Sequence, residues 1–134
     1  MEIKIDNNLL DSLTEQAKSS PRLRMNMDLR NSSADTSQRM LNAIEPGSVV
    51  PIHRHKKTSE TVVVLRGRVV EEFYDDNDHK CIETYEITPL GSICALNIPA
   101  GKWHTLRSLE SGTVILEMKD GAYEPIQECD ILSL

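Results

Sequence analysis

Two histidines and a glutamate in this sequence have the types and the spacing of a transition-metal site. His53 and His55 are two residues apart in a run that is typical of a β-strand, and residues two apart in a strand lie on the same face. Glu60 follows a polar connector and opens a second apolar run that ends at Leu65. Imidazole groups suit Zn, Cu, Fe and Ni. The spacing therefore predicts that these side chains bind one metal ion.

A third imidazole, that of His104, follows a turn formed by Pro99 to Lys102. A chain that folds back on itself could bring His104 to the same pocket, and we expect it there as a further ligand. The fourth histidine, His79, lies in the polar run Asp75 to Lys80. Runs of this composition are typical of turns, so we expect His79 to be a solvated loop residue.

The residues around these side chains resemble the two motifs of the cupin superfamily. The first motif is matched at every position by Gly47, His53, His55, Glu60 and Gly67. The resemblance implies a cupin double-stranded β-helix that holds one divalent transition metal ion, Fe, Ni, Zn or Mn.

The second motif is matched at its centre and departs from the pattern at both ends. Pro99, Gly101 and His104 fit the centre. Ile93 stands where the family has a glycine, and Ser108 stands where it has an asparagine. Neither change affects a metal ligand, so the departures concern loop length and edge geometry. The resemblance implies that His104 completes a ligand set with His53, His55 and Glu60.

Length and composition exclude several classes of protein. A chain of 134 residues is long enough for one domain with its own core. The net charge of −6 and the aromatic content of 4% argue against nucleic acid as a partner, because phosphate binding requires a basic face. No apolar run approaches the roughly 20 residues that span a bilayer. We therefore expect neither nucleic-acid binding nor membrane insertion.

The cysteines and the amino terminus indicate a cytoplasmic protein. Cys81, Cys94 and Cys129 are widely spaced and odd in number, which is typical of reduced thiols rather than of a disulfide framework. We interpret them as packing residues. The first ten residues lack the basic and apolar segments of a secretory signal.

The order of the expected elements is one helix followed by many short strands. An apolar stripe at helical spacing (Leu9, Leu10, Leu13 and Ala17) follows possible capping residues at 6–8 and stops before Pro21. We expect this helix to lie across the barrel, with residues 1–30 as an arm and 31–134 as the barrel of a single domain. Strands are expected at 60–65, 69–74, 81–87, 92–98, 104–108 and 113–119, with a possible final strand in the tail. Short strands separated by turns predict an all-β jelly roll.

Features outside the two motifs resemble the WbuC family of cupin-fold metalloproteins. The matching stretches are Ser20 to Arg24, Gln38 to Ala43, and Glu117 to Tyr123, and the resemblance covers roughly residues 5–125. Members of that family are commonly encoded among bacterial O-antigen polysaccharide genes. The resemblance implies a role in that context and places five side chains at the rim of the pocket: Arg22, Arg24, Glu117, Lys119 and Tyr123.

Four residues are candidates for binding a substrate. Arg22 and Arg24 are two residues apart in an extended segment, and guanidinium groups pair well with phosphate or carboxylate. The alternative for this pair is a solvated basic patch or a plain salt bridge. Arg39 joins the same group of candidates. Trp103 precedes a ligand and could either pack on the lip of the barrel or face the substrate.

Three functions are compatible with this site. The first is a metal-dependent isomerase or epimerase acting on a sugar or sugar nucleotide, for which Glu117, Lys119 or Tyr123 would serve as the general acid or base. The second is an Fe-dependent oxygenase of small molecules, and the third is a metal- or carbohydrate-binding module without chemistry of its own. In each case we expect a small, anionic, sugar-derived ligand and a homodimer.

Overall fold

The computed structural model describes residues 1–133 as one α-helix, ten β-strands and a short 3₁₀-helix. The elements are α1 (Asn7–Ser19), β1 (Arg24–Asp28), β2 (Ser37–Ile44), β3 (Ile52–His53), β4 (Glu60–Arg66), β5 (Val69–Tyr74), β6 (Cys81–Ile87), β7 (Ala95–Ile98), β8 (Trp103–Ser108), β9 (Val114–Asp120), η1 (Glu128–Asp130) and β10 (Ile131–Leu132). The strands form two five-stranded antiparallel sheets. Sheet A has the order β1-β2-β9-β4-β7, and sheet B has the order β10-β3-β8-β5-β6.

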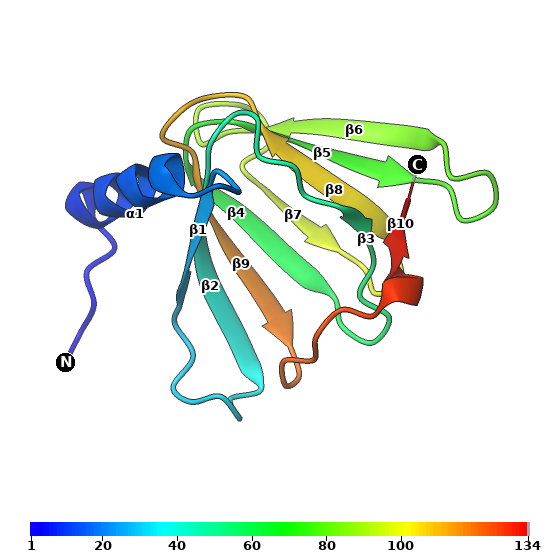
Figure 1. The fold of residues 1–134 in the computed structure, drawn as a ribbon, viewed down its shortest axis with the longest axis horizontal. Helices are drawn as coiled ribbons and strands as arrows, with labels where there is room; N and C mark the ends of the chain where they lie inside the picture. Colours follow the sequence, from blue (N-terminus) through cyan, green and yellow to red (C-terminus); the bar gives the residue numbers. More distant parts are fainter. Residues whose placement is uncertain (134) are drawn as a thin grey trace.

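The two sheets form two layers with the main core between them (Figure 1). This core is built from apolar side chains of both sheets: Ile44, Val62, Val64, Val69, Phe73, Ile87, Ile98, Leu106 and Ile115. They alternate with residues that point outward, as the period of two in a strand requires. The arrangement is the jelly roll expected from the sequence.

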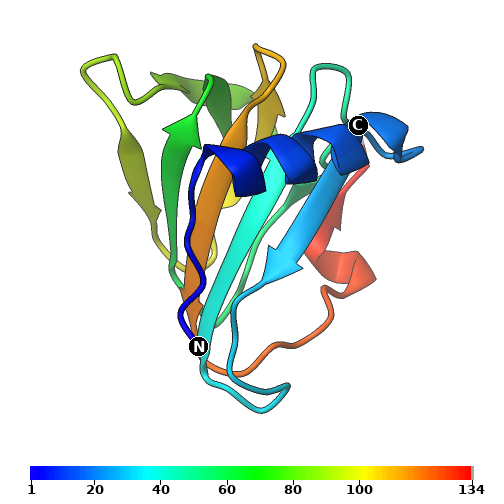
Figure 2. The same ribbon diagram turned by 90° about the vertical axis from the view of Figure 1, so that its left-hand side faces the viewer.

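Helix α1 covers the outer face of sheet A (Figure 2). It begins where the carboxylate of Asp6 accepts a hydrogen bond from the Leu9 amide at 3.0 Å, and it ends before Pro21, as predicted. Its apolar stripe packs on a second buried cluster that includes Leu41, Ala43 and Val114. Helix α1 has 13 residues, and among residues 1–133 no helix has the length and apolar character needed to cross a membrane.

The predicted strands agree with the observed ones, except beside the first histidine pair and at β7. Strands β5 and β6 have the predicted bounds, β4 and β8 differ by one residue at one end, and β9 is shifted by one residue at both ends. Strand β7 begins only at Ala95, and β3 ends at His53. His55 therefore lies in the connector after β3 and not on the same strand as His53. The arm preceding residue 30 contributes β1, which pairs with β2 along its whole length.

The glycine that closes the first motif, Gly67, is required by its backbone and by a close neighbour. Its φ is +87°, a region that favours glycine. A Cβ atom added there would lie 2.7 Å from the Thr113 Cα atom, which is closer than van der Waals contact allows. The connection between β4 and β5 therefore accepts only glycine without rearrangement.

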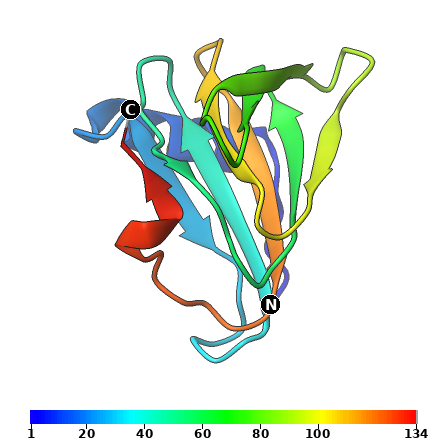
Figure 3. The same cartoon turned by 90° about the vertical axis from the view of Figure 1, so that its right-hand side faces the viewer.

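The segment that follows β9 crosses from sheet A to sheet B and ends in η1 and β10 (Figure 1). In Figure 3 this segment, coloured orange to red, runs along the lower edge of the molecule before it turns up into β10. Asp130 anchors it to the other sheet, because its carboxylate lies 2.9 Å from Arg54 Nε and 3.4 Å from Lys56 Nζ.

The prediction that the cysteines are packing residues is wrong. Cys81, Cys94 and Cys129 are all free and exposed. Cys81 begins the edge strand β6, Cys94 precedes the edge strand β7, and Cys129 lies in η1. Edge strands and the 3₁₀ turn leave side chains in solvent that a central strand would bury.

Candidate metal centre

Both sheets contribute to the cluster of three histidines and one glutamate. In sheet B, His53 of β3 is the direct cross-strand partner of His104 of β8. In sheet A, Glu60 is the first residue of β4. His55 lies in the connector that links the two sheets. The barrel thus brings together residues that are up to 51 positions apart in the sequence.

The four side chains are close enough to share one ion. One ligand atom from each residue can be chosen so that all of these atoms lie within 4.8 Å of one another. Glu60 Oε2 is 3.5 Å from His55 Nε2 and 3.3 Å from His104 Nε2. The ring centroids of His53 and His104 are 4.4 Å apart. Ligand bonds of roughly 2.0–2.2 Å to a transition metal fit these separations.

Backbone carbonyl groups fix the orientation of two of the imidazoles. His53 Nδ1 is 2.8 Å from the Pro51 carbonyl oxygen, and His104 Nδ1 is 2.8 Å from that of Lys102. Because a carbonyl oxygen only accepts, Nδ1 of each ring carries the proton and donates it. The Nε2 atom is then left with a lone pair, which is the form of histidine that binds a metal.

Three buried atoms of the cluster lack a hydrogen-bond partner among the described residues, and they point to the same place. They are His55 Nε2, His104 Nε2 and Glu60 Oε2. A buried polar atom without a partner is costly, and a metal ion would satisfy all three at once. The four residues therefore fit a metal site of the kind that the sequence predicted, and the donor set does not by itself select the metal.

Burial and neighbouring charges keep the ligands in the protonation states that metals require. Burial, and then the neighbouring His104, lower the pKa of His53 to about 4. Burial and then the Lys119 ammonium lower the pKa of His55 to about 4. Burial alone raises the pKa of Glu60, but His104 and Lys119 together outweigh it and bring the value to about 2. At neutral pH His53 and His55 are therefore uncharged and the carboxylate of Glu60 is ionised.

The cluster opens into a cavity of about 800 Å³ between the two sheets, a size typical of small-molecule sites. Buried residues of β5 and β8 such as Leu106 line its inner end, while exposed residues of the segment after β9 line its mouth. Polar side chains from both sheets also face it. The cavity is therefore a concave, mixed-polarity site with the candidate metal ligands in its wall.

Glu117 and Lys119, two of the proposed acid–base residues, line this cavity from β9. Lys119 is the cross-strand neighbour of the ligand Glu60, and its Nζ atom lies 4.0 Å from Glu117 Oε2. The side-chain amide of Asn42 donates to Glu117 Oε1 at 3.2 Å. Burial raises the pKa of Glu117, and the negative charge of Glu60 raises it further.

Tyr123 and Arg24 line the same cavity from its solvent-accessible side, since Tyr123 is exposed and Arg24, on the edge strand β1, is partly exposed. Tyr123 is 59% exposed, and the Arg30 guanidinium lies 5.6 Å from its ring centroid. Arg24 donates to the Val49 carbonyl at 2.7 Å and to Ser48 Oγ at 3.3 Å. Both of these acceptors are uncharged, so the positive charge of Arg24 faces the cavity without a carboxylate partner within residues 1–133.

The two arginines of the Arg22–Arg24 pair do not lie on one extended strand. Leu23, between them, has a φ of +56°, which turns the chain just before β1 begins. Arg22 is exposed and does not line the cavity. The period-two argument that placed both side chains together fails here because it holds only for continuous strand geometry.

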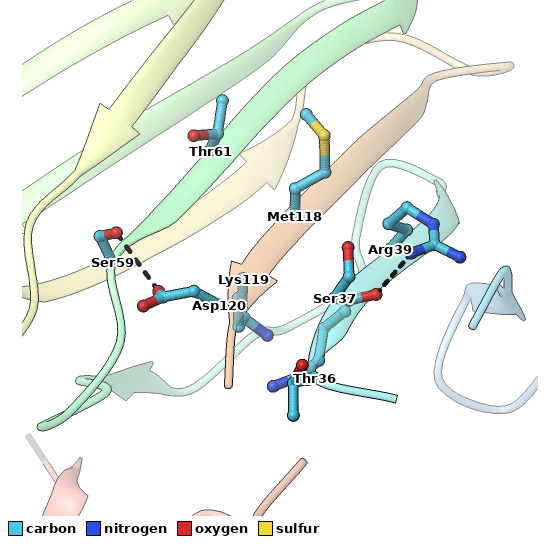
Figure 4. Close-up of a pocket in the computed structure, with 9 residues that line it drawn as sticks. Thr36, Ser37, Arg39, Ser59, Thr61, Met118, Lys119 and Asp120 are labelled. Atoms are coloured by element: carbon cyan, nitrogen blue, oxygen red, sulfur yellow. Dashed lines mark hydrogen bonds between the residues drawn. The ribbon is translucent and has the colours of Figure 1, made fainter. Parts of the chain in front are cut away.

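Arg39 lies on the opposite face of sheet A, beside a shallow depression of about 390 Å³ (Figure 4). Its guanidinium donates to the carbonyl oxygens of Ser37 and Leu29, each at 2.9 Å, and it lies 3.5 Å from Asp35. These contacts hold the loop between β1 and β2. The structure thus places Arg39 away from the metal-ligand cluster.

Trp103 is buried and lies outside the cavity lining. The Arg54 guanidinium lies 4.4 Å from its ring centroid, and the His79 ring lies 6.1 Å away in an edge-on arrangement. Trp103 therefore packs beneath Arg54. His79 lies in a loop as predicted, but this contact leaves it only partly exposed.

The sequence reasoning missed Glu71, a third glutamate in the cavity wall. Glu71 lies on β5, faces the cavity and is 0% exposed. Its position between Val69 and Phe73, two core residues on the same face of the strand, was the signal that could have identified it. No motif includes it, so its burial was not anticipated.

One family model matches residues 5–86, and its description is "Domain of unknown function" (DUF6016). The match covers more than half of the chain. The chain belongs to this family. No curated protein sequence matches this DUF6016 member.

Solved structures share its fold. The capsular polysaccharide assembling protein CapF from Staphylococcus aureus superposes with a TM-score of 0.68 and 22% identity over 86% of this chain and 32% of CapF. KdgF from Halomonas sp. superposes with a TM-score of 0.61 and 14% identity over 78% and 84% of the two chains. An oxalate oxidase in complex with glycolate superposes with a TM-score of 0.64 and 15% identity over 81% of this chain and 56% of the oxidase. The DUF6016 member thus has the cupin fold and spans about a third of the length of CapF.

Proposed function

We propose that this protein is a metal-dependent enzyme of the isomerase or epimerase type that acts on a sugar or sugar nucleotide. The observation that carries the proposal is the composition of one cavity. Its wall holds the candidate metal ligands, an acid–base pair next to them (Glu117 and Lys119), and an unpaired cation near the mouth (Arg24). A substrate with a carbonyl group and an anionic group fits all three features.

The bound metal ion would be held by His53, His55, Glu60 and His104 and would supply a Lewis acid that polarises a carbonyl group. Glu117 is the candidate base, because burial and the negative charge of Glu60 raise the pKa of its carboxyl group, and a carboxylate with a raised pKa accepts a proton more readily. It removes the proton from the carbon next to the carbonyl, and that electron pair moves toward the carbonyl oxygen.

Return of a proton to the adjacent carbon on the same face of the substrate completes an isomerisation, with Lys119 as the candidate donor. Its ammonium group lies on the same cavity wall, 4.0 Å from the Glu117 carboxylate. The overall reaction exchanges one proton for another and needs no oxidant or reductant. Tyr123 at the mouth is the third candidate for proton transfer.

A role in surface polysaccharide biosynthesis is the finer part of the proposal. It is supported by the resemblance to the WbuC family and by the shared fold with CapF, which is described as a capsular polysaccharide assembling protein. This part concerns the pathway rather than the chemistry. It is tested by supplying the nucleotide-linked sugars from which such polysaccharides are assembled.

The proposed reaction is tested by hydrogen exchange. The metal-loaded protein is incubated in D₂O with nucleotide-linked keto sugars, and proton NMR follows the loss of the signal from the carbon next to the carbonyl. We expect the parent to catalyse the exchange and the variants Glu117→Asn and His53→Ala to have lost it. Arg22→Ala, which changes a residue outside the cavity, is the matched control and retains it.

Two other outcomes would replace the proposal. Tight binding of these compounds without exchange in the metal-loaded parent would indicate a binding module. Consumption of dioxygen by the iron-loaded protein in the presence of a substrate would indicate an oxygenase instead. Both outcomes contradict the isomerase or epimerase assignment.

We also infer a homodimer that pairs through β6. This seven-residue strand is an edge of sheet B, and Ile82 on it is 52% exposed. Exposed edges carrying apolar side chains are prone to pairing. Light scattering of the parent is expected to give twice the chain mass of 15.1 kDa. The Ile82→Lys variant is expected to give the mass of a single chain. A parent that scatters as one chain would contradict the dimer.

A further inference from the structure

Glu71 is a buried carboxyl group that forms no ion pair or hydrogen bond with any of residues 1–133. It is 0% exposed, and both of its carboxyl oxygens lack a hydrogen-bond partner among the described residues. Native structures rarely leave buried polar atoms unsatisfied, because the loss of hydration is not offset. An apolar residue at this position would avoid that cost. The free energy of unfolding is therefore lower with Glu71 than it would be with an apolar residue at this position.

The surroundings of Glu71 are those of a hydrophobic core with one open side. Its cross-strand partners are Leu106 of β8 and Tyr85 of β6. Val69 and Phe73, two residues away on the same face of β5, belong to the main core. The open side is the cavity, which Glu71 lines. A group that occupies the inner end of the cavity is thus the partner that Glu71 can reach.

The neighbouring charges disfavour ionisation of Glu71. Burial raises the pKa of its carboxyl group well above the usual range, and the negative charges of Glu60 and Glu117 raise it further. An uncharged carboxylic acid has one donor and several acceptor positions. In either protonation state a carboxyl group accepts a hydrogen bond from a hydroxyl group, and in neither state does it attract an anion through charge.

The mouth of the cavity has the opposite character. Arg24 lines it with a positive charge that only uncharged acceptors contact. Lys119 also lines the cavity. The other cations at the mouth have carboxylate partners, since Arg54 and Lys56 pair with Asp130 and Lys57 lies 4.0 Å from Glu124. The cavity thus offers uncharged hydrogen-bonding groups at its inner end and a free cation near its opening.

We propose that Glu71 is a substrate-binding residue whose carboxyl group holds an uncharged, hydroxyl- or carbonyl-bearing part of the substrate at the inner end of the cavity, while Arg24 holds an anionic part near the mouth. A sugar joined to a phosphate or diphosphate has this arrangement of groups. The inference deepens the proposed function and rests on it for the location of the site. It concerns binding, however, so it can be tested without turnover.

The test compares a sugar nucleotide with the same nucleotide lacking the sugar. UDP-glucose and UDP are titrated by calorimetry into the metal-loaded parent, Glu71→Gln and Glu71→Met. The control is Glu72→Met, because Glu72 is the adjacent residue of β5 and its side chain points to the other face. Metal content is measured for every variant and is expected to be unchanged.

We expect the parent to bind UDP-glucose more tightly than UDP. Glu71→Met lowers the affinity for UDP-glucose about tenfold or more, because the hydrogen bond between the carboxyl group and the sugar is lost. The affinity for UDP is unchanged. Glu71→Gln stays close to the parent, since an amide also donates and accepts. Glu71→Met also melts at a higher temperature than the parent, because it removes the unsatisfied carboxyl group.

Three results would overturn the assignment: a parent that does not bind UDP-glucose, a Glu71→Met variant that binds UDP-glucose as the parent does, or equal losses for UDP and UDP-glucose. The two proposals fail separately. Binding that depends on Glu71 without deuterium exchange in the keto sugars rejects the isomerase or epimerase and retains this inference. Exchange that is unaffected by Glu71→Met, together with unchanged binding, rejects this inference alone.

Discussion

His53 and His104 are direct cross-strand partners in the pair β3–β8, and their ring centroids are 4.4 Å apart. One belongs to the first motif and the other to the second. Each imidazole donates through Nδ1 to a backbone carbonyl two residues earlier in the chain. This pairing joins the two motifs into one site and orients both rings before any ion is bound.

The first prediction concerns metal content. We expect about one transition-metal ion per chain in the purified protein, and none in the double variant His53→Ala/His55→Ala. The variant should remain folded, because the core between the sheets does not include these side chains. Elemental analysis and circular dichroism measure the two properties. The control is His79→Ala, a histidine outside the cluster, and full metal occupancy in the double variant would contradict the site.

The second prediction concerns the pH dependence of stability in the metal-free protein. His53 and His55 have folded-state pKa values of about 4, below the ordinary value of 6.5. They are therefore charged in the unfolded chain but neutral in the folded protein between these values. The free energy of unfolding is therefore unaffected by these histidines above pH 6.5. It decreases as the pH falls toward 4, by on the order of 2–3 kcal/mol per histidine.

Urea denaturation of the metal-free protein between pH 7 and 4.5 measures this effect. The lowered pKa of Glu60, at about 2, affects stability mainly at lower pH. The raised pKa values of Glu71 and Glu117 change stability in the opposite direction within this window, so the difference between the parent and a histidine variant reports on the histidines. The variant His53→Asn/His55→Asn should lose less stability across the window than the parent. Equal slopes for the parent and the variant would show that the imidazoles are not held neutral by burial.

The third prediction separates the two arginines. Arg24→Ala should weaken the binding of sugar phosphates about ten- to a hundredfold, because a charged hydrogen bond contributes roughly 1.5–3 kcal/mol. Arg22→Ala should bind as the parent does, since Arg22 lies outside the cavity lining. Calorimetric titration measures both variants. If Arg24→Ala binds a confirmed ligand like the parent, the cation at the mouth has no role in binding.

The fourth prediction concerns the glycine of the first motif. Gly67→Ala should lower the free energy of unfolding by roughly 2–5 kcal/mol. The energetic cost of a left-handed backbone conformation adds to that of the steric overlap with Thr113. Gly101→Ala is the matched control. It also has a positive φ, of +82°, but a Cβ there meets no atom within 4 Å, so its cost should be only about 1–2 kcal/mol. Equal losses measured by urea denaturation would show that the contact with Thr113 is unimportant.

The sequence alone determined the strands, the helix and the identity of the candidate ligands. Alternation of apolar residues in β4, β5 and β9 marks strands because each has a buried face. The capping residue Asp6 and the stop at Pro21 delimit α1 because both act through local backbone geometry. The spacing of the histidines and Glu60 predicted the cluster because the ligands of one ion lie close together in a turn and its flanking strands.

Only the tertiary structure decided which of the other side chains face the cavity. Sheet A is covered on both faces, by sheet B inside and by α1 outside, so alternation does not tell which face is the interior. That is why Arg24 lies at the cavity and Arg39 on the outer face, although both are arginines at the start of neighbouring strands. Glu71 shows the same limit, because its burial depends on the packing of β5 against distant strands. A local pattern sets the period of a strand, whereas the choice of face is set by what the rest of the chain packs against it.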